Sequence, residues 1–461
     1  MRDLTQGSVA RHVLHLAVFM AVSMIFQTLY YLVDLYFVSR IGKEAIAGVG
    51  MAGNWMLIVL ALTQMLGVGT TVLISHAAGQ KDQPRAQMVF NQSFVLALLV
   101  GASVVVLGFL LRMPYCRWLG ADAGTVEEGA AYLRWFVPGL ALQFALVSMA
   151  SALRGTGIVK PTMIVQVITV IINIILAPVL IAGWGTHHPL GVGGAGLATL
   201  IAIAFGVLAI TAYFVKLEKY VSFDRSLWAP RVKIWKQMLN IGLPAGGEFA
   251  LMGVYVGLVY WIIRGFGAAA QAGFGIGGRL MQSMFLPVMA VAFAASPVAG
   301  QNFGARQPER VRQTFYSGAG ISVASMLVLT LVCQMFPDAL IRFFSHEPQV
   351  VAFGTEYLRI ISWNFTAMAL IFTSSSLFQA LGNTWPPLGS SALRLFIFAA
   401  PAAALSMRPG FTIREVWYLS VVTVAVQAAS NLLLLRREFR RKLAFAPPPP
   451  MAQVSAAGEF G

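Results

Sequence analysis

Long apolar runs recur along the chain from Leu14 almost to Leu435, and short polar stretches separate them. A run of about 20 apolar residues is long enough for a helix to cross the hydrocarbon core of a bilayer. The pattern therefore predicts an all-α integral membrane protein with twelve transmembrane helices. We expect the spans at residues 14–39, 46–78, 92–113, 131–153, 161–183, 192–215, 237–264, 272–299, 314–336, 357–381, 387–407 and 415–435.

The composition agrees with this pattern. Of the 461 residues, 58% are hydrophobic and 11% are charged, and the mean hydropathy is +0.75. A soluble domain carries about 25% charged residues, so the polar side chains present here could not cover the surface of one. The composition excludes a soluble cytosolic enzyme.

The second half of the chain repeats the first half. Several short motifs recur at a constant offset of 225 residues, among them Tyr132-Leu133-Arg134 as Tyr357-Leu358-Arg359 and Gly157 as Gly382. We infer two parallel six-helix bundles related by a pseudo-two-fold axis along the membrane normal, with a central cavity between them. The predicted units are a first lobe at residues 1–216, a basic cytoplasmic linker at 217–236, a second lobe at 237–442 and a disordered tail at 443–461. A doubled bundle is typical of transporters that work by alternating access; an ancient duplication without mechanistic meaning is the alternative.

The net charge of +15 raises the question of nucleic-acid binding. Such binding needs a basic face on a soluble surface, and no segment here provides one, so we expect no nucleic-acid partner. About two thirds of the Lys and Arg residues fall in the termini and the even-numbered loops, which the positive-inside rule places in the cytoplasm. Both termini are therefore predicted to be cytoplasmic.

No cofactor or metal site is expected. Cys116 and Cys333 lie near the outer ends of spans in different halves, which fits neither a disulfide framework nor a metal site. His187 and His188 are adjacent rather than four residues apart, and no acid or cysteine accompanies them.

Two acidic residues lie more than one turn inside predicted spans, Asp34 in the first and Glu248 in the seventh; the other acids lie in loops or near span ends. A charge at the bilayer centre costs at least about 2.5–3.5 kcal/mol, so such residues usually face a cavity or a partner and mark an ion or substrate path. Helical spacing places Gln27, Tyr30 and Tyr31 within two turns of Asp34, where their polar groups could stabilise either protonation state.

Asn173 interrupts the apolar fifth span and is a candidate partner for Asp34. The two residues would then form a proton-coupling site, or alternatively a buried hydrogen-bonded pair that only holds the bundle together.

Glu248 lies within two turns of the cytoplasmic end of its span, so it is either a second functional acid or a solvated side chain. Arg279 and Arg394 are the Lys or Arg residues that lie more than one turn inside the predicted spans, and each is a candidate for lining the cavity. Arg279 lies near the end of its helix, where snorkelling to the membrane surface is the alternative.

Several motifs resemble the multidrug and toxic compound extrusion (MATE) family, and in particular its prokaryotic, DinF-like branch. They include Gly277-Gly278-Arg279-Leu280, the stretch from Ser296 to Arg306, and Leu153-Arg154-Gly155-Thr156-Gly157. The resemblance covers about residues 5–440. It implies a cation-coupled antiporter of a bacterial inner membrane that expels amphipathic organic cations and other toxic compounds.

The resemblance also assigns residues to the coupling site. Asp34 matches the first-helix aspartate that takes up the coupling ion, Tyr30 a tyrosine one turn earlier, Asn173 a fifth-helix asparagine and Thr199 a sixth-helix threonine. Ala177 stands where many members carry a second acid. Glu248 resembles the seventh-helix acid of other branches, but the tenth span lacks the aspartate that accompanies it there, which counts against sodium binding in the second half.

We therefore interpret the chain as a monomeric proton-coupled efflux antiporter for small organic cations, in contact with membrane lipids. A sodium-coupled antiporter and a flippase for a lipid-linked or amphipathic metabolite are the alternatives. An intramembrane enzyme would need clustered acids for a metal-bound diphosphate, and the spans have none. No phosphate-binding loop supports ATP-driven pumping.

Overall fold

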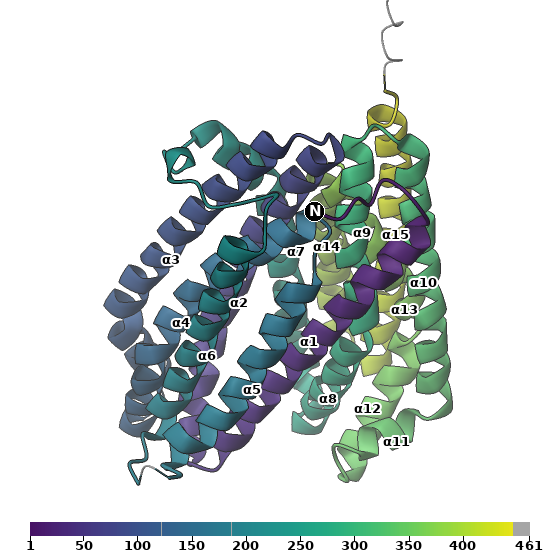
Figure 1. Ribbon diagram of the computed structural model, residues 1–461. Coiled ribbons are helices and arrows are strands. Elements are labelled where there is room, and N and C mark those ends of the chain that lie inside the picture. Colours follow the sequence, from purple (N-terminus) through teal and green to yellow (C-terminus); the bar gives the residue numbers. More distant parts are fainter. Residues whose placement is uncertain (121, 186, 446–461) are drawn as a thin grey trace, which may run out of the picture.

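The computed structural model describes residues 1–120, 122–185 and 187–445, apart from the side chains of Tyr31, Asp34, Leu35, Lys43 and Asn54. Throughout this part of the chain the regular structure is helical (Figure 1). The α-helices are α1 (Val9–Ser39), α2 (Lys43–Gly79), α3 (Gln83–Leu119), α4 (Ala123–Gly155), α5 (Lys160–Ala182), α6 (Gly191–Lys216), α7 (Val232–Ile263), α8 (Ala268–Met284), α9 (Leu286–Gly304), α10 (Pro308–Met335), α11 (Pro337–Arg342), α12 (Pro348–Ile361), α13 (Asn364–Ala380), α14 (Trp385–Ser406) and α15 (Ile413–Lys442). Two short 3-10 helices, η1 (Arg225–Leu227) and η2 (Arg264–Phe266), flank α7.

The predicted membrane protein of twelve spans is confirmed, with a difference in two of them. Among the described residues, 10 helices are long and apolar enough to cross a membrane, and two bent helix pairs raise the number to as many as 12. The bent pairs are α8 with α9, at 42°, and α12 with α13, at 57°. They occupy the predicted spans 272–299 and 357–381, so the expectation of an uninterrupted helix is wrong at these two places.

A proline accounts for the first bend, and side chains of a neighbouring helix stabilise the second. At the first, Pro287 stands in the first turn of α9 and has no N–H to offer to the carbonyl group one turn earlier. At the second, Gln334 of α10 donates from its side-chain amide to the carbonyl oxygen of Arg359 at 2.7 Å and to the hydroxyl of Ser362 at 2.8 Å. Thr330 donates to the carbonyl oxygen of Ser362 at 3.1 Å. Side chains of α10 thus satisfy the backbone groups that the break exposes.

The internal repeat is also visible in the backbone. Lys81 and Arg306, 225 residues apart, have positive φ angles of 58° and 56° and follow α2 and α9 respectively. The same pattern of turn hydrogen bonds surrounds each, since the N–H of Lys81 donates to Ala78 and that of Arg306 donates to Phe303. Gly157 and Gly382 form a second such pair, with φ angles of 78° and 69°.

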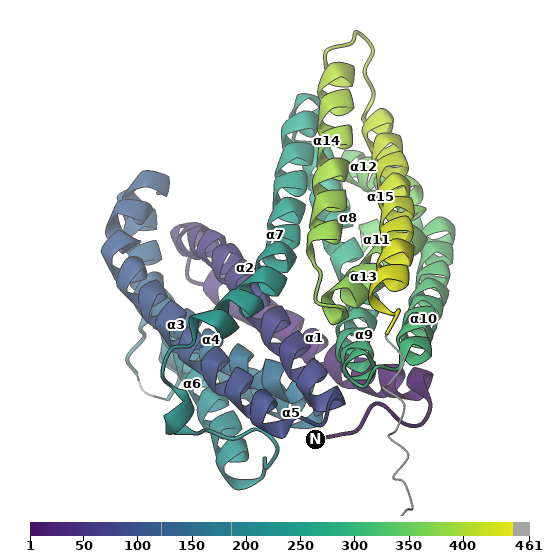
Figure 2. The same ribbon diagram turned by 90° about the horizontal axis from the view of Figure 1, so that it is seen from above.

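The helices gather into two groups, α1–α6 and α7–α15 (Figure 2). The groups meet where α2 packs against α7 and α9, and where α1 packs against α9. The two groups approach closely at the last turns of α2 and α9, because a Cβ at Gly79 would collide with the carbonyl oxygen of Gln301, and one at Gly304 would collide with that of His76. This closed end of the molecule also holds the N terminus (Figure 1).

The segment between α6 and α7 is fastened to the first half. Asn91 of α3 accepts hydrogen bonds from the backbone of Asp224 at 2.9 Å and from the indole of Trp228 at 3.0 Å. Gln92, the next residue, donates to the carbonyl oxygens of Leu227 and Ala229 and accepts from the N–H of Arg231 at 2.8 Å. This segment therefore lies along α3 as an ordered connection.

The limits of the four predicted units, 1–216, 217–236, 237–442 and 443–461, stay a prediction. Helix α15 ends at Lys442, and of the residues predicted as tail, Leu443 is buried and Phe445 packs against Phe303. Residues 446–461, which make up most of that tail, lie outside the described residues.

Candidate functional site

The first candidate site lies in the first half, where α1 packs against α5 and α6. The hydroxyl of Tyr30 on α1 donates a hydrogen bond of 2.7 Å to the hydroxyl of Thr199 on α6. Thr199 is buried. The structure therefore brings together two of the residues predicted for the coupling site, although 169 positions separate them in the chain.

Asn173 on α5 is fully buried in the same half. Neither its amide nitrogen nor its carbonyl oxygen has a hydrogen-bond partner among the groups that the structure describes. A buried polar group without a partner costs about 1–3 kcal/mol, so such a group in a membrane helix usually has a functional reason. Ala177, one turn later on α5, is also fully buried, so the position where the family resemblance implies a second acid faces the interior.

Two predicted residues of this site, Asp34 and Tyr31, have side chains outside the described residues. Their backbone belongs to α1, which continues to Ser39. Gln27, one turn before Tyr30, is half-buried. The roles expected for these three residues stay predictions.

The second candidate site lies within the second half. Glu248 on α7 accepts a hydrogen bond of 2.9 Å from the hydroxyl of Ser375 on α13, and its other described neighbour is the hydroxyl of Ser391 on α14, at 3.5 Å. The side chain of Glu248 is half-buried. It lies where α7, α13 and α14 meet, because its two hydroxyl neighbours come from α13 and α14. Its surroundings are those of an interior carboxyl group rather than of a side chain reaching to the membrane surface.

A chain of side chains leads from Glu248 to Arg394. The side-chain amide of Gln427 on α15 donates to Ser391 at 2.9 Å, and its carbonyl oxygen accepts from the guanidinium of Arg394 at 3.3 Å. The same guanidinium stacks over the ring of Tyr255, 4.5 Å from the ring centre. An acid and a base thus share one polar network, which we call the Glu248–Arg394 relay: Glu248, Ser391, Gln427 and Arg394.

Arg279 does not take part in this relay. Its side chain is exposed on α8, and Ser283 donates to its backbone carbonyl group at 3.1 Å. The prediction grouped Arg279 with Arg394, and the structure separates them.

The sequence reasoning missed Ser375, Ser391, Gln427 and Tyr255. A usable signal was present for the first of them, because Thr373-Ser374-Ser375-Ser376 is a polar run inside an apolar span. The role of Gln427 could hardly be predicted, since the sequence of a membrane helix with a single amide does not indicate which neighbouring helix that amide contacts.

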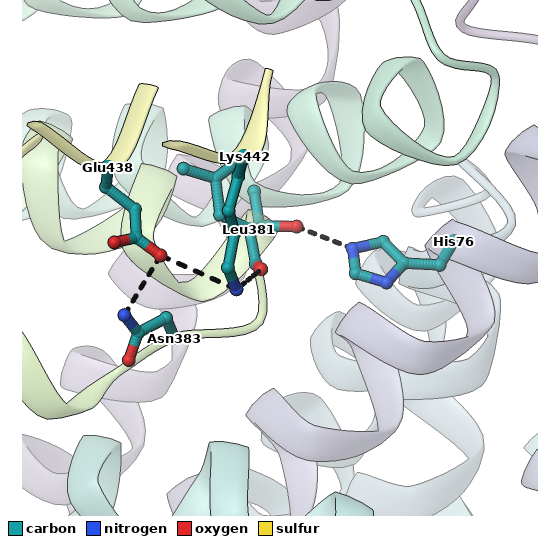
Figure 3. A network of polar contacts seen from close by, with 6 residues as sticks. His76, Leu381, Asn383, Glu438 and Lys442 are labelled. Carbon is teal, nitrogen blue, oxygen red and sulfur yellow. Dashed lines mark hydrogen bonds and ion pairs between the residues drawn. The ribbon is translucent and has the colours of Figure 1, made fainter. Parts of the chain in front are cut away.

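A second set of polar residues that the sequence did not single out joins the two halves at the closed end (Figure 3). The Nε2 atom of His76 on α2 lies 2.6 Å from the carbonyl oxygen of Ala380 on α13, and it must carry the proton because the carbonyl oxygen can only accept. Beside it, Lys442 donates to the carbonyl oxygen of Leu381 at 2.7 Å and lies 3.5 Å from a carboxylate oxygen of Glu438. The last turns of α2, α13 and α15 are thereby tied together.

Residues 2–7 at the N terminus form a strap between the halves. On the first half, the N–H of Arg2 donates to the carbonyl oxygen of Thr156 at 2.9 Å. On the second half, the side chain of Gln301 accepts from the N–H of Leu4 at 3.0 Å, and Arg310 donates to the carbonyl oxygen of Gly7 at 2.9 Å. Beside Leu4, Asp3 accepts two hydrogen bonds from Thr5, which lower the pKa of the Asp3 carboxyl group below its usual value.

Within the described part of the chain, no group of three or more His, Cys, Asp or Glu side chains could hold a metal ion. Cys116 and Cys333 are free and buried.

The comparisons with known proteins agree with this arrangement. The family model described as MatE matches residues 20–179 and 244–405, which together make up more than half of the chain. A FAD transporter of Shewanella oneidensis is 26% identical over 379 residues, which cover 81% of this chain and 83% of that protein. A probable multidrug resistance protein NorM of Thermotoga maritima is 24% identical over 385 residues, 83% of this chain and 82% of that protein. Among solved structures, a MATE family transporter in an outward-facing conformation superposes with a TM-score of 0.88 at 24% identity, covering 96% of this chain and 98% of the other.

Two parallel helical halves, each holding polar groups inside the membrane, define a multi-pass membrane transporter. The chain belongs to the MatE family, the multidrug and toxic compound extrusion transporters.

Proposed function

We propose that the chain is an antiporter that exports amphipathic organic cations and other toxic compounds in exchange for protons, by alternating access. The observation that supports this best is the site in the first half, where the bond between Tyr30 and Thr199 joins α1 to α6 and the amide of Asn173 is buried without a described partner. A side chain with a free donor and a free acceptor can serve a carboxyl group in either protonation state.

Asp34 is the proposed proton carrier. It lies on α1 one turn after Tyr30, and α1 packs against the helix of Asn173. In the ionised state a carboxylate only accepts hydrogen bonds, whereas the protonated acid also donates one. Uptake of a proton would therefore exchange the partners of Asp34 on α5 and change how α1 packs against α5 and α6.

The orientation proposed for the molecule follows from its charge distribution. With both termini in the cytoplasm, as the positive-inside rule indicates, the closed end faces the cytoplasm and the chain is in an outward-facing state. The units at 1–216 and 237–442 would rock against each other, and the segment at 217–236, which is bonded to Asn91 and Gln92, would move with the first unit. We place the protein as a monomer in a bacterial inner membrane.

Sodium coupling through Glu248 is the second candidate. Glu248 has two hydroxyl neighbours, Ser375 and Ser391, and oxygen ligands suit a hard cation. A single carboxylate with two hydroxyl groups is a sparse ligand set, so proton coupling through Asp34 is favoured.

Export of ethidium by purified protein in liposomes tests the proposal, with a proton gradient and a sodium gradient imposed separately. Wild-type transport driven by protons alone, abolished by Asp34→Asn and retained in Glu248→Gln, is the expected result. Sodium-driven transport that is lost in Glu248→Gln would move the coupling site to the second half. Lack of ethidium transport under either gradient would favour a flippase or a carrier of larger metabolites, such as the relative named as a FAD transporter.

A further inference from the structure

Arg394 faces the interior of the second half. It lies near the middle of α14 and shares a helix face with Ser390, Phe398 and Ala402, which are all buried. Its own side chain is half-buried. A guanidinium group is always protonated in proteins, so a full positive charge lies at this depth of a predicted span.

Among the residues that the structure describes, no carboxylate forms an ion pair with Arg394. The ion pairs of the described residues involve Arg312, Arg342, Arg414 and Lys442, and none of them includes Arg394. The described neighbours of the guanidinium are the neutral side chains of Gln427 and Tyr255. The Nε atom of Arg394 is buried and has no hydrogen-bond partner among the described groups.

The nearest acid in the network is Glu248, which is reached through two neutral side chains. Each bond of the relay has its donor on the side of Arg394 and its acceptor on the side of Glu248, because Arg394 donates to Gln427, Gln427 to Ser391, and Ser391 to Glu248. This direction orients the network but leaves the positive charge without an ion-pair partner and the Nε donor without a hydrogen-bond partner among the described groups. A guanidinium presents its N–H donors in a planar fork that matches carboxylate and phosphate groups.

We propose that Arg394 binds an anionic group, a carboxylate or a phosphate, on the transported molecule. Substrates would then include zwitterionic and acidic amphipathic compounds besides organic cations, with the ring of Tyr255 packing beside the bound group. The inference rests on the proposed function, since it requires that the second half contributes to the transport path.

A matched pair of dyes tests the substrate class. One is a rhodamine with a free benzoate group, and the other is the methyl ester of the same dye, which is a cation of nearly the same shape. The readout is the ratio of acid transport to ester transport in liposomes of neutral phosphatidylcholine. Because a hydrogen bond to a charged group changes binding by about tenfold to hundredfold, Arg394→Gln should lower this ratio by about that factor. Arg408→Gln, which removes an exposed arginine just beyond α14, is the control and should leave the ratio as in the wild type.

A competition experiment on the wild-type protein tests the same inference without relying on Arg394→Gln alone. Free benzoate should inhibit transport of the acid dye more strongly than that of the ester in the wild-type protein, and Arg394→Lys, which keeps the charge but not the planar fork, should retain part of the acid transport. Wild-type protein that carries the ester but not the acid, or an Arg394→Gln variant with an unchanged ratio, would overturn the inference. If Arg394→Gln impairs both dyes equally, and only in liposomes that contain phosphatidylglycerol, then Arg394 serves a lipid headgroup and the inference fails. Failure to transport either dye would instead contradict the proposed function.

Discussion

The side-chain amide of Gln301 on α9 donates a hydrogen bond of 3.0 Å to the carbonyl oxygen of Gly155 at the end of α4, and this bond joins the two halves of the molecule. The carbonyl oxygen of the same side chain accepts from the N–H of Leu4. Gln301 is fully buried, so both bonds lie away from water. One amide thus connects the first half, the second half and the N-terminal strap.

Replacing Gln301 with leucine should open the closed end. The change removes both bonds and leaves the Leu4 N–H and the Gly155 carbonyl group buried without a partner, at a cost of about 1–3 kcal/mol for each group. Spin labels at Lys81 and Arg306, which follow α2 and α9, measure the effect by double electron-electron resonance. We expect a longer distance between the labels to gain population in Gln301→Leu.

Gln83→Leu is the matched control for this experiment. Gln83 also donates from its side chain to a backbone carbonyl group, that of Lys219, but both residues belong to the first half and its connecting segment. An identical distance distribution in wild type and Gln301→Leu would show that the amide does not stabilise closure.

Truncating Leu4 should weaken the strap. Leu4 is fully buried in a cluster that includes Val159 of the first half and Val291, Ala294 and Val298 of the second. Removing a buried leucine side chain costs about 2–5 kcal/mol, and here that cost falls on the closed state. Leu4→Ala should therefore raise the reactivity of residues at the closed end toward a membrane-impermeant thiol reagent, measured at a cysteine introduced in place of Ser75. Leu14→Ala, at an exposed position of α1, is the comparison that should leave this reactivity low.

Much of the architecture could be predicted because it depends on local sequence patterns. Apolar runs indicate spans whatever surrounds them, and the repeat that pairs Lys81 with Arg306 survives as an identical turn of the backbone. The bend between α12 and α13 was not predicted, because the groups that stabilise it, Thr330 and Gln334, lie on a different helix. A break in a membrane helix of this kind can be predicted only when the helix whose side chains satisfy the exposed backbone groups is known.

The candidate sites were predictable to a different extent. Tyr30 and Thr199 were expected from the family resemblance, and their hydrogen bond is present. The relay from Glu248 to Arg394 was not expected, since its linking residues are common Ser and Gln side chains whose meaning depends on packing across three helices. The contact between His76 and Ala380 spans 304 positions and ends on a backbone oxygen, which no sequence pattern marks.

Removing the amide of Asn173 should impair proton-coupled transport without impairing folding. In Asn173→Leu a buried group without a described partner is replaced by an apolar one of similar size, which relieves a desolvation cost of about 1–3 kcal/mol if the amide serves no partner. Because Asp34 is the proposed partner of the amide, proton-driven ethidium transport should fall at least tenfold in Asn173→Leu, whereas an amide that serves no partner would leave transport unchanged and the melting temperature the same or higher. Tyr30→Phe, which deletes the hydroxyl that donates to Thr199, should reduce transport less. Full activity in Asn173→Leu would remove this residue from the proposed mechanism.

Adding a single methyl group at Gly79 should block closure. A Cβ at this position would collide with the backbone carbonyl group of Gln301, and backbone atoms cannot move aside as a flexible side chain can. Gly79→Ala should therefore fold but fail to bring the ends of α2 and α9 together, so the short distance between labels at Lys81 and Arg306 should be lost along with transport. Gly50→Ala on the same helix is the control, since nothing lies within 4 Å of the added atom. Because alanine replaces glycine within a helix, that control should if anything stabilise the protein, by about 0.5–1 kcal/mol. A Gly79→Ala variant that transports at the wild-type rate would mean that the close approach of α2 and α9 is not needed for the transport cycle.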